Sequence, residues 1–163
     1  MKFSGKVSAA EILEQENSLK VKKFAVVDAL ELGQLAKDLA TFRNLPIALE
    51  VRIEKWIIYH ASLPGSTPEN QAWLDRKARV VLLKHHSTLY EKASSEERKV
   101  DWYTENNLSE QLYAIHGGGI PIVSINDNFL GCLLISGMPQ IDDHLFGVEV
   151  IAKFINKKAI NYD

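Results

Sequence analysis

Residues 47–54 alternate between bulky apolar side chains at the odd positions and mainly charged side chains at the even positions. Because successive side chains of a strand point to opposite faces, this pattern predicts a half-buried β-strand. A second apolar run, residues 56–61, follows after only Glu54 and Lys55, so the two runs are expected to pair as a hairpin. A two-residue turn would place His60 on the core side of that hairpin, and one extra loop residue would reverse its direction.

Two further apolar runs, residues 120–125 and 129–136, flank the triplet Asn126-Asp127-Asn128. Asn and Asp tolerate left-handed backbone angles, so the triplet predicts the turn of a second hairpin. The outer ends of such a hairpin lie side by side. They would bring residues 117–119, Ser136 and the start of the last helix to one place.

Apolar residues at helical spacing predict helices over residues 8–18, 28–43 and 69–85, and a last helix that begins near residue 140. Two short helices are expected between residues 87 and 111. The inward face of the helix over 69–85 is predicted to consist of Ala72, Trp73, Val80 and Leu83, with Arg76 among them.

An arginine directed at a core is costly unless it is paired. Arg76 is therefore expected to meet a carboxylate. A structural partner such as Glu69, Asp142 or Asp143 and the carboxylate of a ligand are equally compatible with the pattern.

His144 falls within the apolar arc of the last helix, close to its N-terminus. Burial and the positive end of the helix dipole both favour the neutral imidazole. Neutral imidazole can bind a metal or accept a proton, so His144 and His116 are the candidate catalytic bases. The alternative is a structural histidine whose nitrogens bond Asp142, Asp143 or the backbone.

Three glycines follow His116 directly. Gly117, Gly118 and Gly119 can bring the backbone close to a ligand, and consecutive N–H groups could cradle a carboxylate or a phosphate. The alternative is that they only permit a tight turn beside Pro121.

The chain has 163 residues, of which 46% are hydrophobic and 25% charged, and this suits one globular domain. We expect an N-terminal helix and link over residues 1–23 and a core over 24–163. A net charge of −2 without basic runs argues against nucleic acid as a partner. The charged N-terminal segment and the lack of an apolar run of ~20 residues argue against a signal peptide and a membrane span. The single Cys132 fits a reducing, cytoplasmic setting.

The common metal and nucleotide motifs HExxH, CxxC, Walker and Rossmann are absent from the sequence. The adjacent His85 and His86 cannot face the same way on a helix. None of these patterns indicates a metal site.

Three segments together resemble a known family: PGSTPENQAWLDRK at 64–77, HGGGIPI at 116–122 and SGMPQIDDH at 136–144. In this order they resemble one branch of the GlcG/HbpS-like proteins, often labelled haem-degrading domain proteins, over residues 27–155. The resemblance implies an α/β (α+β) fold, a profilin-like three-layer α/β/α sandwich around a central antiparallel sheet. It also implies a homo-oligomer, either a dimer or a larger ring.

For function, the resemblance implies a ligand site. Some relatives bind haem or a corrinoid, so haem is one candidate cofactor, although a haem site needs an axial ligand and a wide apolar pocket. The motif positions become the candidate ligand-binding residues: Asn70, Trp73, Arg76, Lys77, His116, Gly117, Gly118, Ser136, Gly137, Asp143 and His144.

Three functions follow as alternatives. In the first, a cytoplasmic homo-oligomer binds a small anionic ligand, with haem as one candidate, and Arg76 pairs with its carboxylate. In the second, His144 or His116 is the general base of an enzyme, and the glycine N–H groups stabilise an oxyanion. In the third, Arg76, Asp143 and His144 form an ion-pair network in a subunit interface.

Overall fold

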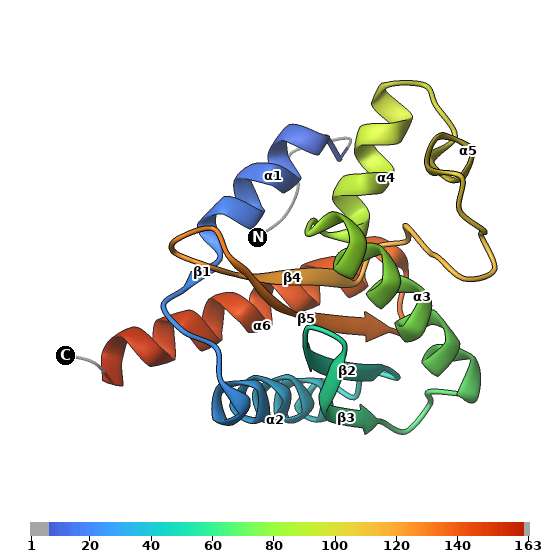
Figure 1. The fold of residues 1–163 in the computed structure, drawn as a ribbon. Coiled ribbons are helices and arrows are strands. Elements are labelled where there is room, and N and C mark those ends of the chain that lie inside the picture. The colour runs from blue at the N-terminus through green and yellow to red at the C-terminus, as the bar shows by residue number, and fades with distance from the viewer. Residues whose placement is uncertain (1–6, 162–163) are drawn as a thin grey trace.

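A five-stranded sheet forms the middle layer of the computed structural model, which describes residues 7–161 (Figure 1). The strand order is β1 (Lys20–Val21), β4 (Gly119–Ser124), β5 (Phe129–Ser136), β2 (Ala48–Ile53) and β3 (Trp56–Ser62). The short β1 pairs with β4 in parallel, and all other neighbours are antiparallel. Both predicted hairpins are present as β2–β3 and β4–β5.

Helices cover both faces of this sheet. Helices α2 (Val26–Phe42) and α6 (Gln140–Asn161) pack on one face, where most of the core lies. Helix α3 (Pro68–Lys84) packs on the other face, over a smaller apolar cluster that includes Cys132. The three-layer α/β/α arrangement expected from the resemblance is confirmed.

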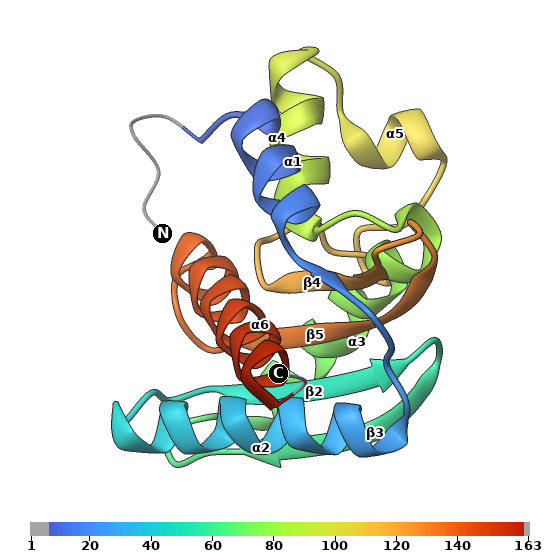
Figure 2. The same cartoon turned by 90° about the vertical axis from the view of Figure 1, so that its left-hand side faces the viewer.

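A second group of helices lies beyond β4. Helix α1 (Ala9–Ser18) runs alongside α4 (Thr88–Glu97), and α5 (Trp102–Asn106) packs on the far side of α4 (Figure 2). The contact between α1 and α4 is apolar and includes Ile12 and Leu89. Among the helices of residues 7–161, none is both long and apolar enough to cross a membrane.

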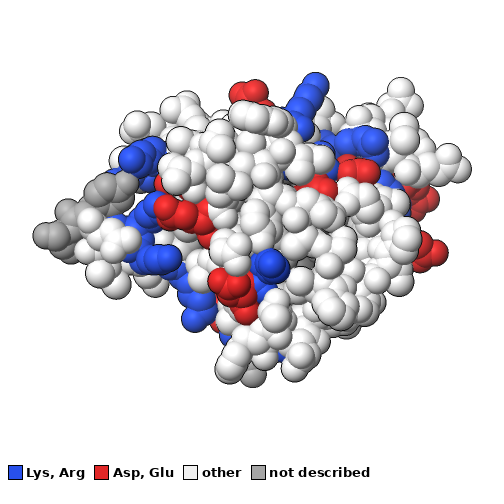
Figure 3. All heavy atoms as spheres, turned by 90° about the horizontal axis from the view of Figure 1, so that it is seen from below, with Lys and Arg blue, Asp and Glu red and all other residues white. Residues whose placement is uncertain are grey.

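Ion pairs join α2 and α6, the two helices that pack on the same face of the sheet. Lys158 of α6 lies 3.1 Å from Asp28 and 2.6 Å from Glu31 of α2, and Arg43 lies 2.6 Å from Glu149. On the face seen from below, basic and acidic side chains accordingly lie intermixed (Figure 3).

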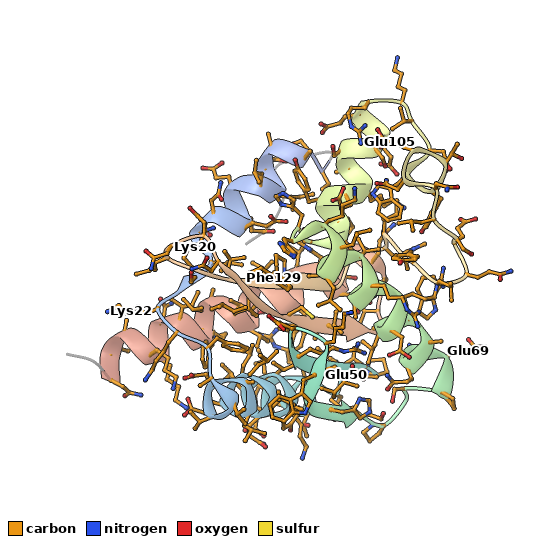
Figure 4. The ribbon with its side chains drawn as sticks, viewed as in Figure 1. Lys20, Lys22, Glu50, Glu69, Glu105 and Phe129 are labelled. Carbon is orange, nitrogen blue, oxygen red and sulfur yellow. The ribbon has the colours of Figure 1, made fainter. Side chains whose placement is uncertain are left out.

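Strand β2 is buried on both faces, so the predicted half-buried strand is wrong on one point. Its apolar residues do face the main core, but Glu50 and Arg52 lie beneath α3 and are also buried. They neutralise one another there, since Nε of Arg52 donates to Glu50 at 2.8 Å and its Nη2 donates to Asp75 of α3 at 2.8 Å. In Figure 4, Glu50 lies inside the fold, whereas Glu69 and Glu105 project at its margin.

A β-bulge reverses the direction predicted for His60. The turn has two residues as predicted, with Ile53 opposite Trp56, but the register then shifts between Val51 and Arg52. One extra residue of β3 is inserted there, and this turns the rest of the strand over. His60 therefore faces away from the main core, and its Nδ1 lies 3.1 Å from Glu50.

The inward face of α3 is also rotated relative to the prediction. Ala72 and Leu83 are exposed, and Trp73 is only half-buried. The buried residues are Leu74, Lys77, Ala78, Val80 and Val81. Apolar residues occur on both arcs of this helix, so periodicity alone did not define its phase.

Candidate functional site

The three motif segments meet at one corner of the molecule, where α3, the loop before β4, the end of β5 and the start of α6 come together. We call this place the polar corner. It contains a cavity of about 300 Å³ that is partly open to solvent. Its lining consists of Asn70, Trp73, Lys77, His116, Ser136, Gly137, Met138, Gln140 and Asp143.

Lys77 is the buried cation of the corner. Its Nζ donates to the carbonyl oxygen of Ile135 at 2.8 Å and to Oδ2 of Asp143 at 3.3 Å. Both charged side chains are almost completely buried. Burial lowers the pKa of Lys77 and raises the pKa of Asp143, because each group loses its hydration.

Asp143 also organises the start of α6. Its Oδ1 accepts a hydrogen bond from the backbone N–H of Met138 at 3.0 Å, and its own N–H donates to Pro139 at 3.0 Å. The predicted helix start, with Asp142 and Asp143 in the first turn, is confirmed. A carboxylate at this position is stabilised by the helix dipole as well as by Lys77.

The glycines allow close packing rather than offering three free N–H groups. The N–H of Gly117 faces Gln140 Oε1 at 3.4 Å, and the N–H of Gly119 donates to Thr88 at 3.0 Å. A Cβ on Gly118 would lie 2.3 Å from the carbonyl oxygen of Ile135, where the backbone φ is +122°. The prediction of a cradle is therefore wrong for the N–H groups of Gly117 and Gly119.

His116 is the imidazole that lines the corner. Its ring meets the Trp73 ring edge-on, with centroids 4.7 Å apart. Its Nδ1 is buried and has no hydrogen-bond partner among the described residues 7–161. Desolvation and the positive charges of Lys92, Lys77 and Arg76 lower the pKa of His116, so its neutral form is favoured.

Arg76 lies outside the corner lining and, contrary to the expectation, pairs with no carboxylate among residues 7–161. Its guanidinium sits 4.3 Å from the centre of the Trp73 ring, and its Nη2 donates to the carbonyl oxygen of Glu110 at 2.5 Å. Arg76 therefore fixes Trp73 and the loop before β4. The rotation of α3 relative to its predicted inward face explains this difference, because Lys77 occupies the inward position that was assigned to Arg76.

His144 is buried as predicted but is not part of the corner lining. Its Nε2 lies 2.6 Å from Oε1 of Gln15 in α1, a partner that the sequence did not indicate. Burial lowers the pKa of His144 to about 4, so the ring is neutral at pH 7. Within the described residues of one chain, Arg76, Asp143 and His144 have different partners and are not joined in one network. A network across a subunit interface stays a prediction.

The remaining lining residues come from the ends of α3, β5 and the following loop. Asn70 Nδ2 donates to the hydroxyl of Ser136 at 3.2 Å across the corner. Met138 and Gln140 were not singled out from the sequence, although both lie within the third motif. Their types carry no charge or ring that would have marked them.

A family model described as haem degrading protein, HbpS-like, matches residues 24–152. The chain belongs to this HbpS-like family. A UPF0303 protein of Streptomyces coelicolor is 36% identical over 151 residues, which span 92% of this chain and 95% of that protein.

Solved structures share the fold of this HbpS-like chain. The crystal structure of Ybr137w has a TM-score of 0.86 and 27% identity, and the match covers 96% of this chain and 92% of that one. The structure of the PduOC–haem complex has a TM-score of 0.68 and 16% identity, over 81% of this chain and 94% of that one. The second likeness shows the fold alone.

A haem group does not fit the polar corner of one HbpS-like chain. Haem is a broad apolar disc that needs wide apolar walls and an axial ligand. Among the described residues that line it, His116 is the single histidine, and Trp73 and Met138 are the only large apolar side chains. The corner fits a smaller and more polar molecule.

The neutral His144 gives a prediction on pH. The folded pKa of about 4 lies below the value of about 6.5 expected for an unfolded chain, so the unfolded state binds a proton first as the pH falls. The contribution of His144 is therefore complete above about pH 6.5 and decreases toward pH 4, by about 3 kcal/mol in total.

Urea denaturation of the wild type and His144→Gln at several pH values measures this term as the difference between the two proteins. The exposed His85→Gln is the matched control and should keep the wild-type pH dependence. Parallel pH profiles for the wild type and His144→Gln would show that the prediction is wrong.

Proposed function

We propose that the polar corner binds a small anionic molecule through carboxylate oxygens. The observation that supports this most strongly is the group of three cations, Lys92, Lys77 and Arg76, around His116, whose pKa is lowered first by burial and then by these charges. A ligand carboxylate would compensate these charges. Nδ1 of His116 is buried without a hydrogen-bond partner in the described part of the chain, and this points to a missing partner at the same place.

The groups around the corner can supply the required donors. Lys77 carries an ammonium with three N–H groups, of which Ile135 and Asp143 use two. The hydroxyl of Ser136 accepts from Asn70 and keeps its own proton for a ligand. Hydrogen bonds to a charged acceptor in such a half-enclosed site are stronger than neutral ones.

The size and lining limit the class of ligand. The cavity is partly open to solvent and is lined mainly by polar side chains, and the Trp73 ring offers one apolar wall. Such a lining suits a small polar molecule better than a large apolar one. A small carboxylic acid therefore fits better than a nucleotide or a porphyrin.

Titration of isotope-labelled protein with sodium malonate, followed by NMR, tests the proposal. We expect shifts of backbone amides at residues 117–119 and 136–138, with sodium chloride at equal ionic strength producing none of them. His116→Ala should weaken malonate binding about tenfold, as expected for the loss of one hydrogen bond to a charged group. His85→Gln, at the far end of α3, should bind as the wild type does. Shifts spread over exposed lysines, without a cluster at the corner, would overturn the proposal.

A further inference from the structure

We propose that Lys77 is a nucleophile that captures the carbonyl carbon of a small aldehyde or 2-oxo acid as a Schiff base in the polar corner. This inference rests on the proposed function, because the anionic group of the ligand would be held beside Lys77. It adds a covalent step and a class of ligand. The glycine N–H groups and the His144 side chain play no part in it.

The position of Nζ favours such a reaction. Lys77 reaches the lining of the corner from the middle of α3, and its amine is otherwise surrounded by protein. A Cβ on Gly118 would lie only 2.8 Å from Nζ and 2.3 Å from the carbonyl oxygen of Ile135, so the backbone packs closely against the amine on this side and shields it from water. Lysines that form Schiff bases are typically held in such desolvated positions.

The neighbouring carboxyl group supplies the proton transfer. Asp143 Oδ2 lies 3.3 Å from Nζ, and no water is needed between them. Burial lowers the pKa of Lys77 and raises that of Asp143, so moving a proton from the ammonium to the carboxylate costs less here than it would in water. In the reaction the resting ion pair gives way when the ammonium passes one proton to Asp143, and the amine gains a free electron pair.

The step balances without an oxidant or a reductant. The electron pair of Nζ forms a bond to the carbonyl carbon, and the carbonyl π electrons move to oxygen, which gives a carbinolamine after proton transfer. Asp143 then protonates the hydroxyl group, which leaves as water while the C=N bond forms. Amine plus carbonyl compound gives imine plus water, and the carboxylate of Asp143 remains beside the cationic imine.

The other lining groups can orient a 2-oxo acid for this attack. The carboxylate of the 2-oxo acid would lie toward Ser136, Asn70 and His116, which are the other hydrogen-bond donors of the corner besides Lys77. The carbonyl carbon would then face Nζ. An aldehyde without a carboxylate would react more slowly because nothing would hold it in place.

Reductive trapping tests the inference on the intact protein. The protein is incubated with glyoxylate and sodium cyanoborohydride, which reduces the imine to a carboxymethyl amine, and the labelled lysine is identified by peptide mass spectrometry. We expect label at Lys77 before any exposed lysine, and its loss in Lys77→Arg. The control Lys84→Arg removes a lysine seven residues along the same helix and should leave the label unchanged.

The outcomes separate this inference from the proposed function. Malonate cannot form an imine, so it should bind and slow the labelling of Lys77. Malonate binding together with label only on exposed lysines would overturn the inference and retain the anion site. Label on Lys77 that malonate does not slow would support the nucleophile and contradict the anion site. Identifying the labelled lysine in the wild-type protein separates these outcomes even if Lys77→Arg folds poorly.

Discussion

Replacing Asp143 with alanine is expected to lower the free energy of unfolding by about 3–5 kcal/mol, the usual cost of leaving one member of a buried ion pair alone. The variant would leave the Lys77 amine buried with the carbonyl oxygen of Ile135 as its remaining partner. It would also remove the acceptor for the N–H of Met138 at the start of α6. Urea denaturation at pH 7 measures the loss.

The neighbouring Asp142 provides the matched control. It lies in the same helical turn but is exposed, so Asp142→Ala should cost less than about 1 kcal/mol. In the double variant Lys77→Met with Asp143→Ala, no charge is left unpaired, and we expect part of the stability to return. Equal stability of Asp143→Ala and Asp142→Ala would contradict the role given to the buried pair.

Replacing Gly118 with alanine is expected to cost about 4 kcal/mol or more, the range in which a substitution acts through strain or a buried clash. The added Cβ would lie 2.3 Å from the carbonyl oxygen of Ile135 and 3.0 Å from Cβ of Asp143. The backbone cannot move away easily, since the carbonyl of Gly118 accepts a hydrogen bond from the N–H of Ile135 at 2.8 Å. The φ of +122° adds conformational strain for any L side chain.

The comparison is with Gly147→Ala in the middle of α6. The new Cβ there would meet the terminal methyl of Ile120, which is the end of a flexible side chain, and alanine favours the helix. We expect a change within about 1 kcal/mol in calorimetric unfolding. If Gly118→Ala and Gly147→Ala unfold at the same temperature, the close approach of the backbone at Gly118 is not required.

The hairpins were predictable because local rules determine them. The turn at Asn126–Asn128 needs a left-handed residue, and Asp127 provides it with a φ of +63°. The two-residue turn after Ile53 follows equally from spacing. The direction of His60 was not predictable, since the bulge in β3 depends on how the strand fits between its neighbours.

The polar corner was predictable as a meeting of segments, but its charges were not assigned to the right side chains. Convergence of the second hairpin, the glycines and α6 followed from chain topology. Lys77 takes the inward place predicted for Arg76 because α3 is rotated about its axis relative to the prediction. The apolar residues on both arcs of α3 did not define this rotation. The pairing of His144 with Gln15 joins residues 129 positions apart, and no local pattern marks it.

The central claim is that the polar corner binds a small carboxylate. A crystal structure of the protein with malonate tests it most directly. The claim predicts malonate between Lys77, Ser136 and His116, with a carboxylate oxygen within hydrogen-bond distance of the His116 ring. Malonate bound only at exposed lysines, with the corner closed by its own side chains, would contradict it.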